Sequence, residues 1–262
     1  MRILMIGDVV GSPGRNCVRD MLPRIIENYQ IDFSIANGEN LAAGIGFNEK
    51  TANELFTYGV NVLTMGNHVW DKKEALDYIL KERRIVRPIN YPLGAPGHGQ
   101  AVFDCKGIKI GVLNASGRIF MPALDCPFRS LKKAAEQMQN EATILVVDFH
   151  AEATSEKIAM GRYLDGTVAA VVGTHTHVQT ADERLLPEGT AYITDVGMTG
   201  PLESVLGIDP EIIIKKFLTQ MPARFEVMEK GPVQFNAVVI DVDEVTGKAI
   251  SIERIYDTLD VN

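Results

Sequence analysis

Side chains that can bind metals or transfer protons occur at five places in this 262-residue chain, each just after a short apolar run. They are Asp8 in GD, Glu39 and Asn40 in GEN, Asn67 and His68 in GNH, His150 in FH, and His175 and His177 in GTHTH. Carboxylate, amide and imidazole groups without a thiolate suit ions such as Mn, Fe or Zn. Buried together without a cation, such groups would destabilise the fold.

Each of these motifs has a structural explanation when it is taken alone. Asp8 would serve as a helix cap, GEN as a turn with Asn40 in a left-handed conformation, and His150 as a hydrogen-bonded core histidine. The HTH segment favours a metal more strongly, because residues two apart in an extended segment face the same side. Taken together, the groups predict a metal site.

The ligand types predict two divalent or trivalent transition-metal ions. A carboxylate between two histidine-bearing groups can bridge two ions, and we expect Fe, Mn or Zn, with Fe or Mn favoured. The charge of two such ions exceeds that of Asp8, Glu39 and a bound hydroxide, so the site would attract an anion such as a phosphate ester. Metal-bound water also loses its proton near neutral pH, which provides a nucleophile without a side-chain base.

Short apolar segments must position these side chains. Strands are predicted at residues 2–6, 32–36, 61–65, 144–149 and 168–172, and helices at 48–58, 129–139 and 154–164. This alternation indicates βαβ units, in which the carboxyl ends of the strands meet at one edge of the sheet. Glycines directly before several of the motifs would let the backbone turn sharply there.

The last third of the chain has a different pattern. Strands are predicted at 190–196, 233–242 and 249–256, the last two joined by a Thr-Gly-Lys turn as an antiparallel hairpin. The predicted fold class is therefore α/β, a layered sandwich with a second sheet. We expect residues 1–262 to form a single domain in which the stretch 91–128 includes loop excursions that rim or cap the site.

Composition limits the classes of partner. A formal net charge of −8 disfavours binding to duplex nucleic acid, which requires many contacts from Lys and Arg to phosphate. KERR at 81–84 lies in a helical pattern and is interpreted as a solvated helix face. The three cysteines lack a CxxC pair, and no apolar run approaches the length of a membrane span. We expect a soluble cytoplasmic protein without disulfides or membrane partners, and leave homo-oligomerisation open.

The ordered set of motifs resembles a known superfamily. GD at 7–8, GEN at 38–40, GNHVW at 66–70, a strand-end His150 and GTHTH at 173–177 look like the motifs of the calcineurin-type metallophosphoesterases. Along essentially its whole length, the chain is similar to their bacterial YmdB-like branch of cyclic-nucleotide phosphodiesterases. It departs from the wider pattern at Val10, where an Asp-x-His motif would have histidine, and at Glu39, where aspartate is usual.

This resemblance implies a four-layer α/β/β/α sandwich with a two-metal centre. One ion would be held by Asp8, Asn40 and His177, the other by Asn67, His150 and His175, with Glu39 as the bridge. Asn40 would replace the missing histidine. His68 would be catalytic, stabilising charge on phosphorus or protonating the leaving oxygen. Trp70 is interpreted as packing beneath the loop, with stacking on a nucleobase as the alternative.

Three functions compete at this point. The first is a phosphodiesterase in which a metal-bridging hydroxide attacks small cyclic nucleotides, including 2′,3′-cyclic monophosphates. The second keeps the metal centre but acts on phosphomonoesters or phosphoproteins, because the loops around the centre determine specificity. The third is a regulatory or RNA-associated protein whose metals are structural.

Overall fold

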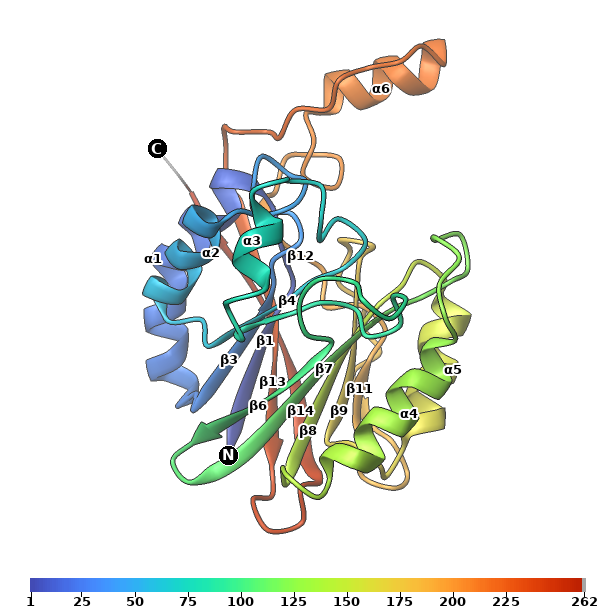
Figure 1. Cartoon of the computed structure of the whole chain (residues 1–262). Helices are drawn as coiled ribbons and strands as arrows, with labels where there is room; N and C mark the ends of the chain where they lie inside the picture. Colours follow the sequence, from blue (N-terminus) through green and yellow to red (C-terminus); the bar gives the residue numbers. More distant parts are fainter. Residues whose placement is uncertain (261–262) are drawn as a thin grey trace.

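The computed structural model describes residues 1–260, in which two β-sheets lie face to face between layers of helices (Figure 1). The strands of the eight-stranded first sheet run in the order β2 (Asp8–Val9), β12 (Met198–Pro201), β13 (Val233–Val242), β1 (Arg2–Ile6), β3 (Phe33–Asn37), β4 (Val62–Thr64) and β5 (Ile85–Val86), and β14 (Ala249–Leu259) pairs with β13. The six-stranded second sheet has the order β10 (Arg184–Leu185), β11 (Ala191–Ile193), β9 (Ala170–Thr174), β8 (Ile144–His150), β7 (Ile108–Ser116) and β6 (Gln100–Cys105).

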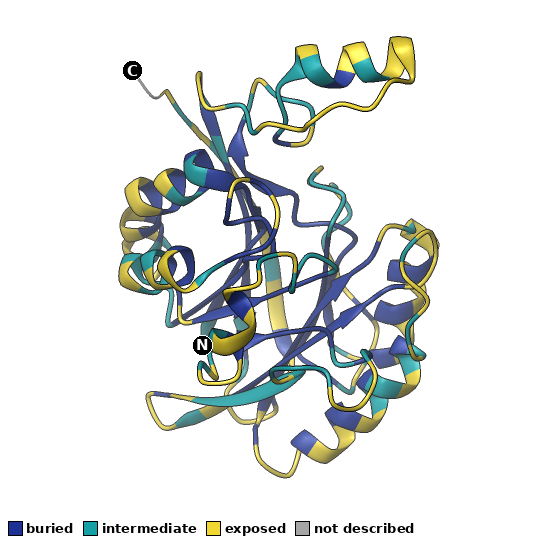
Figure 2. Ribbon diagram, turned by 45° about the horizontal axis from the view of Figure 1, so that its top comes forward, coloured by how far each residue is buried: buried dark blue, intermediate teal, exposed yellow. Residues whose placement is uncertain are grey.

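Helices cover the outer faces of both sheets. The first sheet carries α1 (Gly11–Tyr29), α2 (Glu49–Tyr58) and the short α3 (Ala75–Ile79), and the second carries α4 (Pro127–Met138) and α5 (Thr154–Leu164) (Figure 1). Figure 2 shows that these helices are buried on the side facing the sheets and exposed on the other. The predicted helices 48–58, 129–139 and 154–164 are confirmed within two residues at each end. Asn48 caps α2 in a capping box with Thr51, and Gly59 ends it at a φ of 111°.

Three apolar layers hold the sandwich together. Ile3, Met5, Val112 and Val146 belong to the layer between the sheets. A second layer lies between α1, α2 and the first sheet, and a third between α4, α5 and the second sheet. These three layers separate four layers of secondary structure, so the predicted α/β/β/α sandwich is confirmed. The inner strands read as continuous apolar runs because they are covered on both faces.

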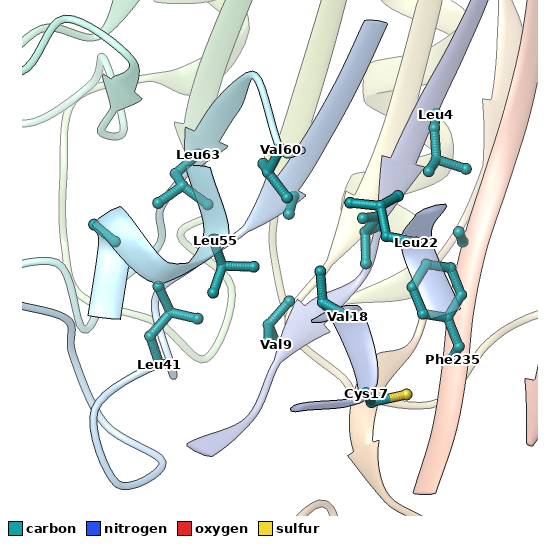
Figure 3. Packing of buried hydrophobic residues seen from close by; sticks show 14 of the residues in the cluster. Leu4, Val9, Cys17, Val18, Leu22, Leu41, Leu55, Val60, Leu63 and Phe235 are labelled. Atoms are coloured by element: carbon teal, nitrogen blue, oxygen red, sulfur yellow. The ribbon is translucent and has the colours of Figure 1, made fainter. Parts of the chain in front are cut away.

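The layer beneath α1 illustrates how the helices attach. Val18 and Leu22 of α1 are fully buried beside Leu4 of β1 and Phe235 of β13 (Figure 3). Cys17 belongs to the same layer, and burial raises the pKa of its thiol to about 12, so it behaves as a small apolar group. All three cysteines are free thiols, as the sequence predicts.

One sequence expectation is wrong. KERR at 81–84 is not helical, because α3 ends at Ile79; Arg84 instead pairs with Glu82 and stacks over Phe56 at 3.8 Å from the ring centre. The stretch 91–128 contains two strands in addition to loops. Residues 100–116 form the β6–β7 antiparallel hairpin, which completes the second sheet, so only the flanking loops remain free to rim a site.

A different segment leaves the sandwich. Residues 202–232, which contain α6 (Pro210–Thr219), project from one end of the molecule, and α6 is mostly exposed (Figures 1 and 2). Ile213 is the one buried residue of this helix. Among residues 1–260, no helix has the length and apolar character needed to cross a membrane.

Candidate metal centre

Five chain segments bring the candidate residues to one edge of the sandwich. β1, β3 and β4 run parallel in the first sheet, and β8 and β9 run parallel in the second. Asp8 follows β1, Glu39 and Asn40 follow β3, and Asn67 and His68 follow β4. His150 ends β8, and His175 and His177 follow β9. The carboxyl ends of the two parallel groups therefore meet between the sheets.

Three of these side chains converge on the ring of His150. His150 Nε2 lies 3.0 Å from Glu39 Oε1, 3.2 Å from Asn67 Oδ1 and 3.0 Å from His175 Nδ1. Ligand atoms of Glu39, His150 and His175 all lie within 4.8 Å of one another, the spacing of groups that can share one ion. Glu39 and His150 are buried, and His175 is partly buried.

Asp8 and His177 lie beside this cluster. Asp8 Oδ1 is 3.9 Å from both His150 Nδ1 and His177 Nε2, and Asp8 Oδ2 accepts the backbone N–H of His175 at 3.2 Å. Asn40 donates its Nδ2 to the carbonyl of Gly44 at 2.9 Å. Within residues 1–260, no contact joins Asn40 Oδ1 to the other candidate side chains, so its place in the cluster is the least constrained.

Burial and mutual charge shift the pKa values of the cluster in opposite directions. Burial raises the pKa of Asp8 to about 6, against the opposing effect of His177 and His150. Burial also disfavours ionised Glu39, but the charges and hydrogen bonds of His150 and His68 together outweigh it and lower the pKa of Glu39 to about 2. For His150, burial is outweighed by Glu39 and Asp8, so its pKa rises to about 9. Burial and the charge of His150 lower the pKa of His175 to about 3.

These shifts and two unpaired oxygens fit a metal centre. The pKa of Glu39 is lowered and that of His150 is raised, which means that the cluster favours a positive charge at its middle. Asp8 Oδ1 and Asn40 Oδ1 are buried and have no hydrogen-bond partner among the described residues. Unpaired buried acceptors are costly, and a cation would satisfy both. The donor set of carboxylate, amide oxygen and imidazole matches transition metals.

A buried polar network orients His150, and the sequence does not reveal it. The Nδ1 atom of His150 lies 2.9 Å from Thr174 Oγ1, which donates to Asp148 Oδ1 at 2.7 Å. Asn37 Nδ2 donates to Asp148 Oδ2 at 3.1 Å. The network keeps Nε2 of His150 directed at Glu39 and Asn67, as hydrogen bonds behind metal-binding histidines commonly do.

The backbone of the GTHTH segment is strained. His175 and His177 have φ values of 102° and 65°, in the left-handed region that disfavours residues with a Cβ. Thr176 lies between them and donates its N–H and Oγ1 to Asp195 Oδ2 at 3.1 and 2.8 Å. The buried Lys157 donates Nζ to the same oxygen at 2.5 Å. The Lys157–Asp195 pair therefore anchors the turn that carries both histidines.

The glycines before the motifs allow neighbouring side chains and backbone to approach closely; they are not needed for sharp turns. Gly66 does not have a positive φ, but a Cβ there would lie 2.3 Å from the ring of His150 and 2.4 Å from Glu39 Oε2. At Gly173 a Cβ would lie 1.7 Å from the carbonyl oxygen of Thr194. Asn40 also does not adopt the left-handed conformation considered from its sequence.

His68 lies beside the buried cluster and is connected to it through its backbone. Its backbone N–H donates to Glu39 Oε2 at 2.9 Å, and its Nδ1 lies 2.6 Å from Asp71 Oδ2. Its side chain is 33% exposed, so a substrate can reach it. Asp71 is not among the residues predicted from the sequence, although its position three residues after His68 could have indicated a partner for that histidine. Trp70 packs edge-on against Tyr91 with ring centres 4.5 Å apart, in agreement with a packing role.

The sandwich and the carboxylate–imidazole cluster at its strand ends define a metallophosphoesterase. The model of the family described as YmdB-like protein matches residues 4–255, so the chain belongs to the YmdB-like family. The chain is 52% identical over 255 residues to the 2′,3′-cyclic-nucleotide 2′-phosphodiesterase of Bacillus subtilis, covering 97% of this chain and 96% of that protein.

Solved structures agree with this assignment. The crystal structure of a protein described as a novel phosphatase from Mycoplasma pneumoniae matches with a TM-score of 0.93 and 39% identity, covering 99% of this chain and 94% of that one. The NAD nucleotidase of Haemophilus influenzae shares the fold with a TM-score of 0.62 at 13% identity, over 99% of this chain and 56% of that chain. The predicted family and enzyme class, a phosphoesterase, are therefore confirmed.

Proposed function

We propose that the protein hydrolyses small cyclic nucleotides, among them 2′,3′-cyclic monophosphates, with two transition-metal ions. The convergence of Glu39, Asn67 and His175 on His150 Nε2 within 3.2 Å carries this proposal. The similarity to the Bacillus 2′,3′-cyclic-nucleotide 2′-phosphodiesterase supports the choice of substrate.

The residues divide into two ligand groups in this proposal. Glu39 would hold both ions, and its two oxygens face His150 and the backbone of His68. The remaining ligands are Asp8, Asn40 and His177 for the first ion, and Asn67, His150 and His175 for the second. When bound, such ions supply positive charge to the phosphoryl oxygens and acidify a bound water. Of the metals that suit these ligands, we favour iron or manganese.

The protein's own side chains contribute to the reaction by protonating the leaving oxygen. Hydrolysis of a 2′,3′-cyclic phosphate at the 2′ position forms a bond from a water oxygen to phosphorus and breaks the bond from phosphorus to O2′. The O2′ atom then needs a proton. His68 Nε2 donates it, while Asp71 accepts the Nδ1–H and orients the ring.

The His68→Ala variant tests this role through its dependence on the leaving group. We expect kcat for a 2′,3′-cyclic nucleotide to fall by about 10²- to 10⁴-fold, the usual contribution of a general acid. A p-nitrophenyl ester, whose leaving oxygen needs no proton, should lose much less. His98→Ala is the control, because His98 lies outside the cluster. Equal losses on both substrates would rule out the proton-donor role.

Relative turnover of diesters and monoesters tests the substrate class. We expect kcat/KM for a 2′,3′-cyclic nucleotide and for bis-p-nitrophenyl phosphate to exceed that for p-nitrophenyl phosphate. The experiment uses the metal-loaded protein with each substrate at the same pH and ionic strength. A strong preference for the monoester would instead favour a phosphomonoesterase or phosphoprotein phosphatase with the same centre. If the protein hydrolyses no phosphoester and still binds a partner after the metals are removed by chelation, the regulatory alternative is favoured.

A further inference from the structure

A cavity of about 310 Å³ adjoins the candidate metal centre on the side of β12, β13 and β14. His177 belongs to both places: its Nε2 faces Asp8 at 3.9 Å, and its Nδ1 lies 3.0 Å from the carbonyl oxygen of Leu206, which lines the cavity. Met198 lines the cavity too, and it is the residue of β12 that pairs with Asp8 of β2. His177 therefore connects the cavity with the candidate metal centre.

The cavity wall combines apolar and amide groups. Tyr256, whose side chain is 57% exposed, presents an aromatic ring, and Met198 and Leu206 add apolar surface. No hydrogen bond within residues 1–260 uses the side chain of Gln234, so its amide offers both a donor and an acceptor. Asn236 is 2% exposed, and its Oδ1 has no partner among the described residues. Such a buried acceptor gains from a donor supplied by a ligand.

These groups suit an uncharged heterocycle better than a second phosphate. The cation of the wall, Arg254, is paired with Glu183 at 2.7 Å, so it does not offer a free positive charge. A nucleobase has flat faces for stacking and an edge with both donors and acceptors. The volume of the cavity is at the lower end of the range for small-molecule sites.

The geometry of the substrate agrees with this placement. In a 2′,3′-cyclic nucleotide the base is attached to C1′, next to the C2′ that carries the phosphate ring, so base and phosphate occupy neighbouring sites. A larger cavity of about 970 Å³ is lined by none of the candidate metal ligands; its lining is Ser12, Arg15, Ala43, Ile45, Lys72, Asp209 and residues 223–230. The larger cavity shares no residue with the candidate metal centre, whereas His177 belongs to both the smaller cavity and the centre.

We propose that the cavity beside His177 is the nucleobase subsite, with Tyr256 stacking on the base and Gln234 reading its edge. This proposal rests on the proposed function and adds the element that selects nucleotides over other phosphodiesters. Tyr256 and Gln234 are specificity residues in it, since neither contacts the phosphate.

Two variants and two substrates test the subsite. Tyr256→Ala and Gln234→Leu are assayed with adenosine 2′,3′-cyclic phosphate and with the 2′,3′-cyclic phosphate of methyl riboside, which lacks a base. We expect each variant to lower the ratio of kcat/KM for the nucleotide over the abasic diester about tenfold, mainly through KM. Tyr163→Ala is the matched control, because Tyr163 of α5 is 46% exposed and lies outside the cavity. Its ratio should equal that of the wild type.

The outcomes separate the subsite from the catalytic proposal. If the wild type hydrolyses both substrates and the variants keep the wild-type ratio, the cavity does not bind the base. If both substrates lose kcat/KM equally in the variants, the residues act on the metal centre, and the subsite is likewise wrong. A wild type that hydrolyses neither substrate overturns the proposed function itself.

Discussion

Replacing Glu39 by glutamine should lower kcat/KM for cyclic nucleotides by roughly 10³-fold or more, because the ions of such a centre contribute several kcal/mol to the transition state. The side chain keeps its shape, but one oxygen becomes an amide N–H₂ and the negative charge is lost. Oε1 faces His150 at 3.0 Å and Oε2 accepts the His68 N–H at 2.9 Å, so neither position suits a donor. Elemental analysis should find two ions per chain in the wild type and fewer in the variant.

Glu136→Gln is the control for this change. Glu136 Oε1 of α4 lies 3.9 Å from Lys132 Nζ, and its side chain is 59% exposed. Solvent screens such a contact, so we expect little change in activity or metal content. Thermal unfolding of both variants shows whether the fold survives. Full activity and full metal content in Glu39→Gln would contradict the bridging role.

Breaking the buried pair of Lys157 and Asp195 should have the largest effect on stability. Both side chains are 1% exposed, and removing one partner from a buried ion pair typically costs about 3–5 kcal/mol. We therefore expect Asp195→Asn and Lys157→Met each to lower the free energy of unfolding by about that amount in urea titrations. Asp165→Asn, which disturbs hydrogen bonds to Glu188 and Thr190 at another turn, should cost much less.

A double variant separates stability from the positioning of the histidines. Lys157→Met combined with Asp195→Leu removes both charges, so it should recover much of the lost stability. It should not recover activity or metal binding, because Thr176 still lacks the carboxylate that holds it between His175 and His177. Recovery of both properties would mean that the pair has no role in shaping the site.

The main elements could be predicted from the sequence because their signals are local. The strand at 2–6 reads as a nearly continuous apolar run and the strand at 233–242 as a β-rich segment, and both lie at the predicted positions. The Asn48 cap and the Gly59 stop located α2 for the same reason. The β6–β7 hairpin was missed because its first strand is mostly half-exposed, which weakens the apolar pattern. KERR was assigned to a helix because charged residues fit a solvated helix and a turn equally well.

The candidate site also has features that the sequence predicts and features that only the structure shows. The sequence by itself determined which side chains could meet, because their motifs follow strand ends and parallel strands share an edge. Only the tertiary structure decided how they meet: Thr174 and Asp148 behind His150, Asp71 behind His68, and Lys157 with Asp195 beneath the GTHTH turn. Most of these contacts join residues far apart in the chain, and a buried polar group looks the same in sequence whether its partner is present or not. Their geometry follows from how the two sheets pack, which no local pattern records.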